Sequence, residues 1–245
     1  MRFVATFQLK KEQVPQNYRP IFLSFLKNAL TRYQNGALYD TYYGSPKEKP
    51  FTFSISFGSC RFADEKIILP DKLLRFHFST SDALTGIHFY NALRLQKGMP
   101  FALPLENAMT LTGFYMEADE VISQNRLEVN FTAPLCVRLH NRETNKDTYL
   151  TCQDENFSRE LMAILAYQLQ SIPGLAKKLS TFSIMPMNAK TVMVKHYEHS
   201  IPCSLGLFRL EGDIQLLTHL YLSGLGSRKS SGFGYFNIIR QGGDS

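Results

Sequence analysis

The segment SGLGSRKSSGFGYFNII, residues 223–239, contains two Gly-hydrophobic-Gly triplets separated by a basic, hydroxyl-rich run. Glycine adopts positive φ readily and allows another backbone to approach closely. The serines and the two cations between the triplets supply hydrogen-bond donors. A flexible phosphodiester backbone suits such a loop, and the residues expected to contact it are Gly224, Gly226, Ser227, Arg228, Lys229, Ser230, Ser231, Gly232 and Gly234.

This loop matches neither of the common glycine motifs that bind nucleotide phosphates. A P-loop has lysine after its last glycine, whereas Gly232 is followed by Phe233. The dinucleotide fingerprint needs a third glycine three residues on, whereas Gly226 is followed by Ser-Arg-Lys. An alternative reading is a glycine-rich turn packed tightly under the preceding helix. Arg228 and Lys229 argue against it, because adjacent cations must stay solvated or find anions.

The first half of the chain has the pattern βαββαβ. Alternating apolar residues predict strands at residues 2–9, 51–58, 66–79 and 109–118. The third of these strands is expected to have a turn or kink at Pro70. Apolar residues at helical spacing predict helices at residues 17–32 and 81–98. Ser81 or Asp82 is the expected N-cap of the second helix, and Gly98 its expected end.

The second half repeats the same order of elements. Strands are predicted at residues 126–140, 147–153, 181–188, 191–199, 202–212 and 232–239, the first two as a pair joined by a polar turn. Helices are predicted at residues 156–174 and 213–224. We therefore predict an α+β protein of two tandem ferredoxin-like, RRM-like domains, residues 1–120 and 121–245, the second carrying the glycine-rich loop 224–234.

Composition agrees with two small domains and excludes several classes of protein. The 245 residues carry a net charge of +6, which is compatible with a polyanionic partner. No apolar run approaches the roughly 20 residues of a membrane span, and the first residues alternate as a strand rather than resembling a signal peptide. We therefore expect a cytoplasmic protein with no membrane contact. The cysteines are isolated and expected to be reduced, and we expect no metal site and no cofactor.

The sequence GLGSRKSSGFGYFNI resembles the glycine-rich loop of the RAMP superfamily, and specifically its CRISPR-associated repeat-RNA-processing endoribonucleases. The start MRF, the helix ending FLKNAL and the strand KPFTFSISF resemble that family in the same order. The resemblance implies binding of CRISPR repeat RNA, that is, of precursor CRISPR RNA. It also implies cleavage without metal, by attack of a ribose 2′-hydroxyl on the adjacent phosphate. Further basic residues expected to bind RNA are Arg32, Lys47 and Lys195.

The resemblance also implies a catalytic centre around the segment before residue 51. Many family members have a histidine in or after the first helix, whereas the first histidine here is His77. Matching outward from KPFTFS places Tyr43 at or next to the histidine position, Lys49 at the family lysine and Lys27 at a helix position sometimes held by tyrosine. Tyrosine has a pKa near 10, so Tyr43 is expected to orient a group and the two lysines to stabilise the charged phosphorane.

The other histidines of the chain are alternative candidates for the missing base. His77 and His219 are expected to be structural, His88 lies in a helix and His140 in a turn. His196 and His199 have no third ligand that would make a zinc site, and His196 is a candidate for RNA contact or catalysis.

Two functions remain open at this point. The first is an endoribonuclease that cuts CRISPR repeat transcripts into guide RNAs, favoured by the size and the repeated βαββαβ pattern. The second is a RAMP protein that binds repeat RNA without cutting it, as a structural subunit of an effector complex, favoured by the missing histidine. A homodimer is compatible with either function. An unrelated tandem ferredoxin-like RNA binder is the third and weaker reading.

Overall fold

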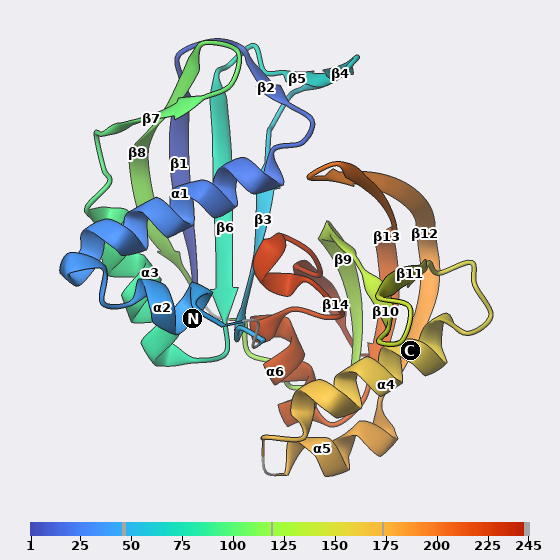
Figure 1. Ribbon diagram of the computed structural model, residues 1–245. Helices are drawn as coiled ribbons and strands as arrows, with labels where there is room; N and C mark the ends of the chain where they lie inside the picture. Colours follow the sequence, from blue (N-terminus) through green and yellow to red (C-terminus); the bar gives the residue numbers. More distant parts are fainter. Residues whose placement is uncertain (46–47, 119, 173, 243–245) are drawn as a thin grey trace.

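Strand β1 (Arg2–Leu9) lies at the centre of the first sheet. The computed structural model describes residues 1–245 except 46–47, 119, 173 and 243–245. Phe3, Ala5 and Phe7 of β1 are buried, and the strand pairs antiparallel with β6 on one side and with β8 on the other. The N-terminal domain is built outward from this strand (Figure 1).

The sheet of the N-terminal domain has the strand order β3-β6-β1-β8-β7. Apart from the edge strand β7, this is the order of a ferredoxin-like βαββαβ unit, with its first and third strands at the centre. The remaining strands are β3 (Phe51–Ser56), β6 (Leu73–Thr80), β7 (Pro100–Leu103) and β8 (Asn107–Glu117). The helices are α1 (Arg19–Arg32), η1 (Tyr33–Gly36), α2 (Tyr39–Tyr43) and α3 (Ala83–Arg94).

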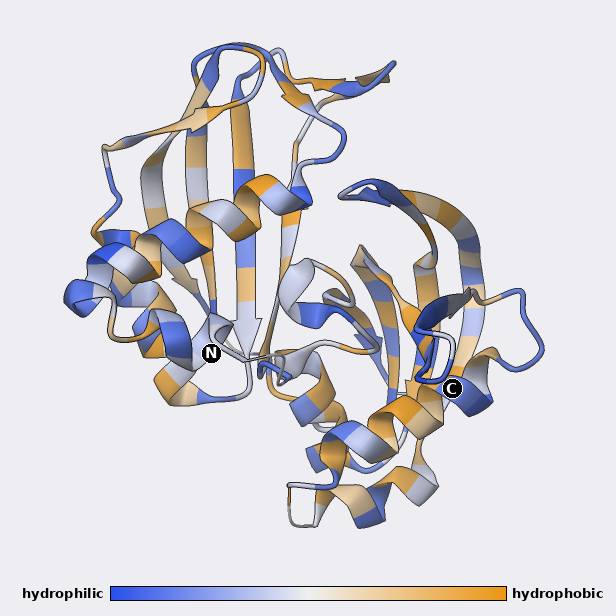
Figure 2. Cartoon of the chain, viewed as in Figure 1, coloured by the Kyte–Doolittle hydropathy of each residue, from blue (hydrophilic) through white to orange (hydrophobic). Residues whose placement is uncertain are grey.

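Aromatic side chains hold α1 and α3 on this sheet. Phe22 of α1 stacks on Phe76 of β6 with ring centroids 5.7 Å apart, and Phe89 of α3 lies 4.8 Å from Phe51 of β3. Figure 2 shows hydrophobic and hydrophilic residues alternating along the strands, as expected when one face of a sheet is covered by helices. The Asp82 carboxylate accepts from the Thr85 amide at 2.9 Å, which confirms it as the N-cap of α3.

The C-terminal domain repeats the arrangement with the sheet order β12-β13-β9-β14. Its strands are β9 (Arg126–Leu135), β12 (Ser183–His196), β13 (His199–Glu211) and β14 (Phe236–Gln241). Its helices are α4 (Phe157–Leu169), α5 (Leu175–Lys178), η2 (Leu179–Thr181), α6 (Ile214–Ser223) and η3 (Lys229–Ser231). The predicted α+β fold of two tandem ferredoxin-like domains is confirmed.

Two predictions for the C-terminal domain were wrong in detail. Residues 126–140 do not form one strand paired with 147–153: β9 ends at Leu135 and pairs with β13 and β14. The chain then forms a separate hairpin, β10 (Val137–Asn141) with β11 (Lys146–Leu150). Residues 181–199 were predicted as two strands but contain the single long strand β12, whose pairing with β13 continues across a register shift near Pro186.

The N-terminal domain also carries a small sheet that the sequence did not predict. Its strands, in the order β2-β5-β4, are β2 (Gln13–Pro15), β4 (Arg61–Ala63) and β5 (Lys66–Ile68). The single strand predicted for residues 66–79 is divided into β5 and β6, with Lys72 at φ 54° in the turn between them. No helix within the described residues has both the length and the apolar character needed to cross a membrane.

Hydrogen bonds from three strands of the N-terminal domain attach the two domains to each other. Arg2, 1% exposed, donates to the Phe236 carbonyl and to Asn237 Oδ1 of β14. The hydroxyl of Thr52 on β3 donates to the Phe233 carbonyl at 2.8 Å. On β6, Ser79 donates to a carbonyl at the end of α6. The glycine-rich loop therefore lies between the domains.

Candidate nucleic-acid interface

The glycines of the loop allow close packing between the domains. Gly224, Gly226, Gly232 and Gly234 have φ between 72° and 88° and are all buried. A Cβ at Gly232 would lie 2.6 Å from the ring of Phe53 on β3. Their burial indicates that these glycines let the loop pack closely, as in the tightly packed turn considered above. The expected contact of the four glycines with RNA stays a prediction.

Backbone groups of the loop are also used within the protein. The Leu225 amide donates to the Gly234 carbonyl at 3.0 Å, the Gly234 amide to Pro134 at 2.9 Å, and the Ser227 amide to Cys136 at 2.7 Å. These bonds join the two ends of the loop to each other and to the end of β9. The exposed side of the loop is therefore formed by its side chains rather than by its glycines.

The two cations of the loop are both paired with acids. Lys229 is 7% exposed, and its Nζ lies 2.7 Å from Glu48 Oε1. Arg228 has the left-handed φ of 57° and places Nη2 3.1 Å from Asp147 Oδ2 on β11. Charge pairing thus permits both cations in a tightly packed loop, because each of them has found an anion.

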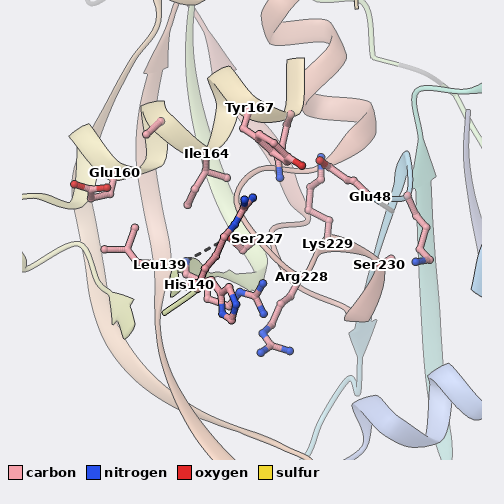
Figure 3. A pocket seen from close by; sticks show the side chains of 15 residues that line it. Glu48, Leu139, His140, Glu160, Ile164, Tyr167, Ser227, Arg228, Lys229 and Ser230 are labelled. Atoms are coloured by element: carbon pink, nitrogen blue, oxygen red, sulfur yellow. Dashed lines mark hydrogen bonds and ion pairs between the residues drawn. The ribbon is translucent and has the colours of Figure 1, made fainter. Parts of the chain in front are cut away.

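A cavity of about 680 Å³ opens beside this loop (Figure 3). Of the predicted site residues, those that line it are Lys49, Ser227, Arg228, Lys229 and Ser230. The β10–β11 hairpin contributes Arg138, His140 and Arg142, and helix α4 contributes Glu160, Tyr167 and Gln168. Cations outnumber carboxylates on its wall, which suits a polyanionic ligand.

Lys27, Tyr43 and Lys49, predicted as the catalytic residues, lie near one another, and of the three Lys49 lines this cavity. The Nζ atoms of Lys27 and Lys49 lie 5.2 Å and 6.0 Å from the centroid of the Tyr43 ring. Burial and the positive charge of Lys27 lower the pKa of Lys49. Burial raises the pKa of Tyr43 above its ordinary value, so its hydroxyl keeps its proton.

The Tyr43 hydroxyl is buried without a hydrogen-bond partner among the described residues. Burying such a group is unfavourable for folding unless it is hydrogen-bonded. The ring, by contrast, has both ammonium groups within about 6 Å of its centroid, and contacts of cations with an aromatic face are favourable. The arrangement of Tyr43 supports orientation of a group rather than action as a base.

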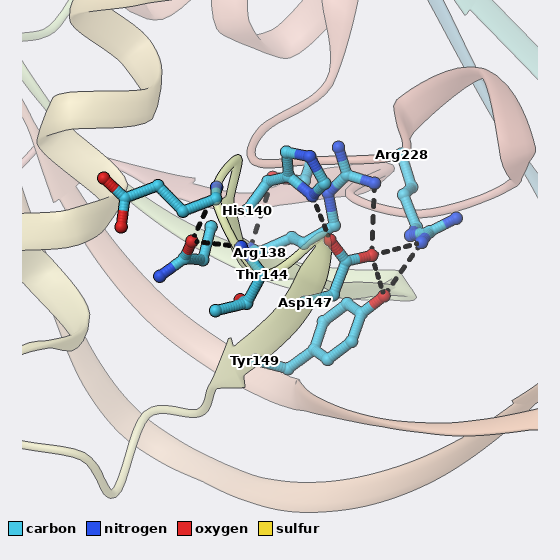
Figure 4. Close-up of polar contacts among 9 residues, drawn as sticks. Arg138, His140, Thr144, Asp147, Tyr149 and Arg228 are labelled. Atoms are coloured by element: carbon cyan, nitrogen blue, oxygen red, sulfur yellow. Dashed lines mark hydrogen bonds and ion pairs between the residues drawn. The ribbon is translucent and has the colours of Figure 1, made fainter.

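Asp147 organises the side of the cavity formed by the hairpin (Figure 4). Its carboxylate accepts from His140 Nδ1 at 2.8 Å, Arg138 Nη1 at 3.3 Å and the Tyr149 hydroxyl at 3.1 Å, besides Arg228. Although burial acts in the opposite direction, these hydrogen bonds and charges lower the pKa of Asp147. The carboxylate therefore stays ionised and fixes four cationic or titratable side chains.

Sequence reasoning missed this hairpin site because NRETNK was read only as a polar turn. The signal that could have found it is register: in a hairpin with this turn Arg138 faces Tyr149, and His140 faces Asp147. Basic and acidic residues opposite each other on a short exposed ribbon indicate an organised polar cluster.

The remaining predicted RNA contacts within the described residues do not line the cavity. Arg19, at the start of α1, donates to the Gly232 carbonyl of the loop. Arg32 lies at the other end of this helix, about 20 Å away, and contacts Met99. Lys195 forms an ion pair with Glu65 at 2.6 Å. Ser231 belongs to η3 but is not part of the cavity wall, and Lys47 lies outside the described residues.

His196, the other candidate, is 3% exposed and packs with its ring 5.5 Å from that of Phe233. Burial, with the nearby positive charges of Arg228 and Arg19, lowers its pKa to about 4. The neutral ring is therefore part of the interface between the loop and β12. Within the described residues, no group of three or more His, Cys, Asp and Glu side chains could hold a metal ion.

Solved structures share this fold over nearly the whole chain. A Cas6-related protein from Pyrococcus furiosus has a TM-score of 0.86 at 20% identity, covering 99% of both chains. A RAMP protein binding different RNA substrates has a TM-score of 0.85 at 19% identity, covering 98% of this chain and all of that chain. A CRISPR-associated Cas6 protein gives 0.75 at 17% identity, covering 98% of this chain and 99% of that chain.

No curated protein matches the chain in sequence. Residues 116–238 match the family described as CRISPR associated protein Cas6, C-terminal. This match extends from the end of β8 to β14 and includes the hairpin, α4 and the glycine-rich loop. The chain therefore belongs to the Cas6 family of CRISPR-associated proteins.

Proposed function

We propose that this protein binds CRISPR repeat RNA in the cavity between the glycine-rich loop, the hairpin and the segment before β3. The observation that carries the proposal is the meeting of Lys49 with Arg228 and Lys229 on the wall of one cavity. These residues come from the two parts of the sequence that resemble the repeat-processing endoribonucleases. A backbone phosphate in this cavity would meet cations from both domains, and phosphate contacts supply much of the affinity for nucleic acids.

We further propose that the protein cuts the bound precursor RNA by attack of a 2′-hydroxyl on the neighbouring phosphate, without a metal ion. This reaction develops negative charge on the phosphorane, and preorganised cations lower its energy. The proximity of the Lys27 and Lys49 ammonium groups to the Tyr43 ring supports this role for the two lysines. Tyr43 holds its proton and takes no part as a base.

Labelled cognate repeat RNA incubated with the protein in EDTA tests the cutting reaction. The expected product carries a 2′,3′-cyclic phosphate and leaves a 5′-hydroxyl fragment. RNA with a 2′-deoxy substitution at the cleaved nucleotide is the matched control and should bind equally but stay intact. Product formed only with added metal, or formed equally from the 2′-deoxy RNA, would contradict the mechanism.

The second candidate is a RAMP protein that binds repeat or guide RNA without cutting it, as a subunit of an effector complex. The observation in its favour is the tyrosine with a buried, unionised hydroxyl at the position where relatives of this family carry a histidine. The same assay separates the two candidates, because tight binding of the cognate repeat without cyclic phosphate supports the second.

A further inference from the structure

His140 is placed on the cavity wall by the register of the hairpin. In β10 it faces Asp147 of β11, with Nδ1 2.8 Å from Oδ1. The imidazole is 38% exposed and lines the same cavity as Lys49. A histidine therefore borders the same cavity as the segment before β3.

The partner of His140 determines which ring nitrogen carries the proton. Asp147 is kept ionised by its hydrogen bonds and by Arg138 and Arg228, so its oxygens can only accept. Nδ1 must then be the donor, and Nε2 is the nitrogen without a proton when the ring is neutral. This is the orientation that a carboxylate imposes on a histidine acting as a general base.

Charged and titratable groups from several elements line the cavity with this ring or bond its partner Asp147. They are Arg138 and Arg142 on its own side of the hairpin, Asp147 and Tyr149 on β11, Glu160 and Tyr167 on α4, Arg228 and Lys229 on the loop, and Glu48 and Lys49 before β3. A phosphate drawn in by these cations would lie within the space that the ring borders.

The other histidines are placed differently. Burial lowers the pKa of His196 and of His219 to about 4, so both rings are neutral and enclosed. The remaining histidines do not line the cavity and are His77, His88 and His199. Within the described residues, His140 is therefore the imidazole available to a ligand beside Lys49.

We propose that His140 is the general base of the cleavage reaction, a step that rests on the proposed function. Nε2 takes the proton of the 2′-hydroxyl as its oxygen forms a bond to phosphorus. The bond from phosphorus to the 5′ oxygen breaks, and the Lys49 ammonium gives that oxygen a proton. Solvent then returns a proton to Lys49 and removes one from His140, which restores both groups.

The test is single-turnover cleavage of cognate repeat RNA by His140→Ala, with binding measured on the 2′-deoxy RNA. We expect the rate to fall by about 100-fold or more, the range of general base catalysis, while RNA affinity changes by less than about threefold. Free imidazole in the buffer should restore part of the rate, because the shortened side chain leaves room for it in the cavity. The acidic limb of the rate against pH should disappear in the variant.

His199→Ala is the matched control, since it removes an exposed histidine outside the cavity and should cut like the wild type. Two results would overturn the role of His140: cleavage by His140→Ala at the wild-type rate, or a lost rate that imidazole does not restore. A wild-type protein that binds the repeat but forms no cyclic phosphate would instead refute the proposed function, and this step with it.

Discussion

Lys229 Nζ lies 2.7 Å from Glu48 Oε1, so an ion pair joins the glycine-rich loop to the segment that carries Lys49. The side chain of Lys229 is 6% exposed and that of Glu48 is 37% exposed. The pair thus holds together, across the domain interface, the two segments that we propose to act on RNA. Its two members are not equivalent, because water can reach only one of them.

This asymmetry predicts unequal effects of the two single substitutions. Glu48→Gln leaves a buried ammonium without a counterion and should lower the free energy of unfolding by about 3 kcal/mol. Lys229→Met leaves a carboxylate that water can solvate and should cost about 1 kcal/mol. Urea denaturation measures both. An equal loss, or a larger loss for Lys229→Met, would show that the pair is not the constraint we describe.

Gly234→Ala should be among the most damaging single substitutions in the loop. Its Cβ would lie 1.9 Å from the Leu225 carbonyl oxygen at a residue with φ 72°. We expect a loss of at least about 3 kcal/mol in the free energy of unfolding. Gly98→Ala is the control, since Gly98 has φ 79° with nothing near its Cβ position, and should cost only about 1 kcal/mol. Similar losses would mean that backbone conformation, not packing, requires the glycine.

Tyr43→Phe separates stability from activity. The change removes a buried hydroxyl without a partner, so the thermal midpoint should stay the same or rise. The ring and its contacts with Lys27 and Lys49 are kept. The cleavage rate should nevertheless fall more than the RNA affinity, because the hydroxyl is expected to orient a reacting group. An unchanged rate would remove the hydroxyl, though not the ring, from the site.

His196 makes stability depend on pH. Its pKa is lowered from the ordinary 6.5 to about 4 in the folded protein, so the unfolded chain binds a proton that the folded protein excludes. Stability present at neutral pH is therefore lost as the pH falls from 6.5 toward 4. Between about pH 7 and about pH 5 this amounts to about 2 kcal/mol.

Urea denaturation of the wild type and of His196→Phe at these two pH values measures the effect. The variant should lose less stability than the wild type on acidification, by about that amount. The exposed His199, changed to Phe, should leave the difference unaltered. Parallel losses in wild type and His196→Phe would assign the pH dependence to other groups.

Arg142 tests whether RNA enters the cavity on the hairpin side. It is exposed and lines the cavity, so Arg142→Ala should weaken binding of repeat RNA and reduce the salt slope of the binding constant by about 1. Arg61→Ala removes an exposed arginine of the small sheet and serves as the control. Equal salt slopes for wild type and Arg142→Ala would exclude a phosphate contact there.

The sequence contained enough information to predict the order of elements in both domains. Apolar residues recur at every second position of a strand, as at Phe3, Ala5 and Phe7, because they are buried on one face of the sheet. This pattern can be recognised within a short stretch of sequence. The strand pair around the turn NRETNK was predicted, but the end of β9 at Leu135 was not, because β9 pairs with strands distant in sequence and local pattern cannot show where it ends.

The candidate site was predicted in part and for different reasons. Lys27, Tyr43 and Lys49 came from a resemblance between sequences, and the structure brings them together. Arg32 and Lys195 were predicted from their charge alone, and charge does not show which way a side chain points. Arg32 contacts Met99 and Lys195 pairs with Glu65, and neither lines the cavity. The four loop glycines were expected to contact RNA. The sequence alone cannot show that Thr52 and Phe53 of β3 pack against Gly224 and Gly232.

Pairing of β14 with β9, in which Phe236 faces Phe131, has a consequence for the order of folding. These strands are separated by most of the C-terminal domain, and a long chain segment must be closed before they can pair. The N-terminal sheet has an equivalent requirement, because Phe3 of β1 faces Met116 of β8, so we expect each sheet to form only after its distant strands meet. Docking of Gly232 against Phe53 then comes late, and the cation-lined cavity is completed in the last step of refolding.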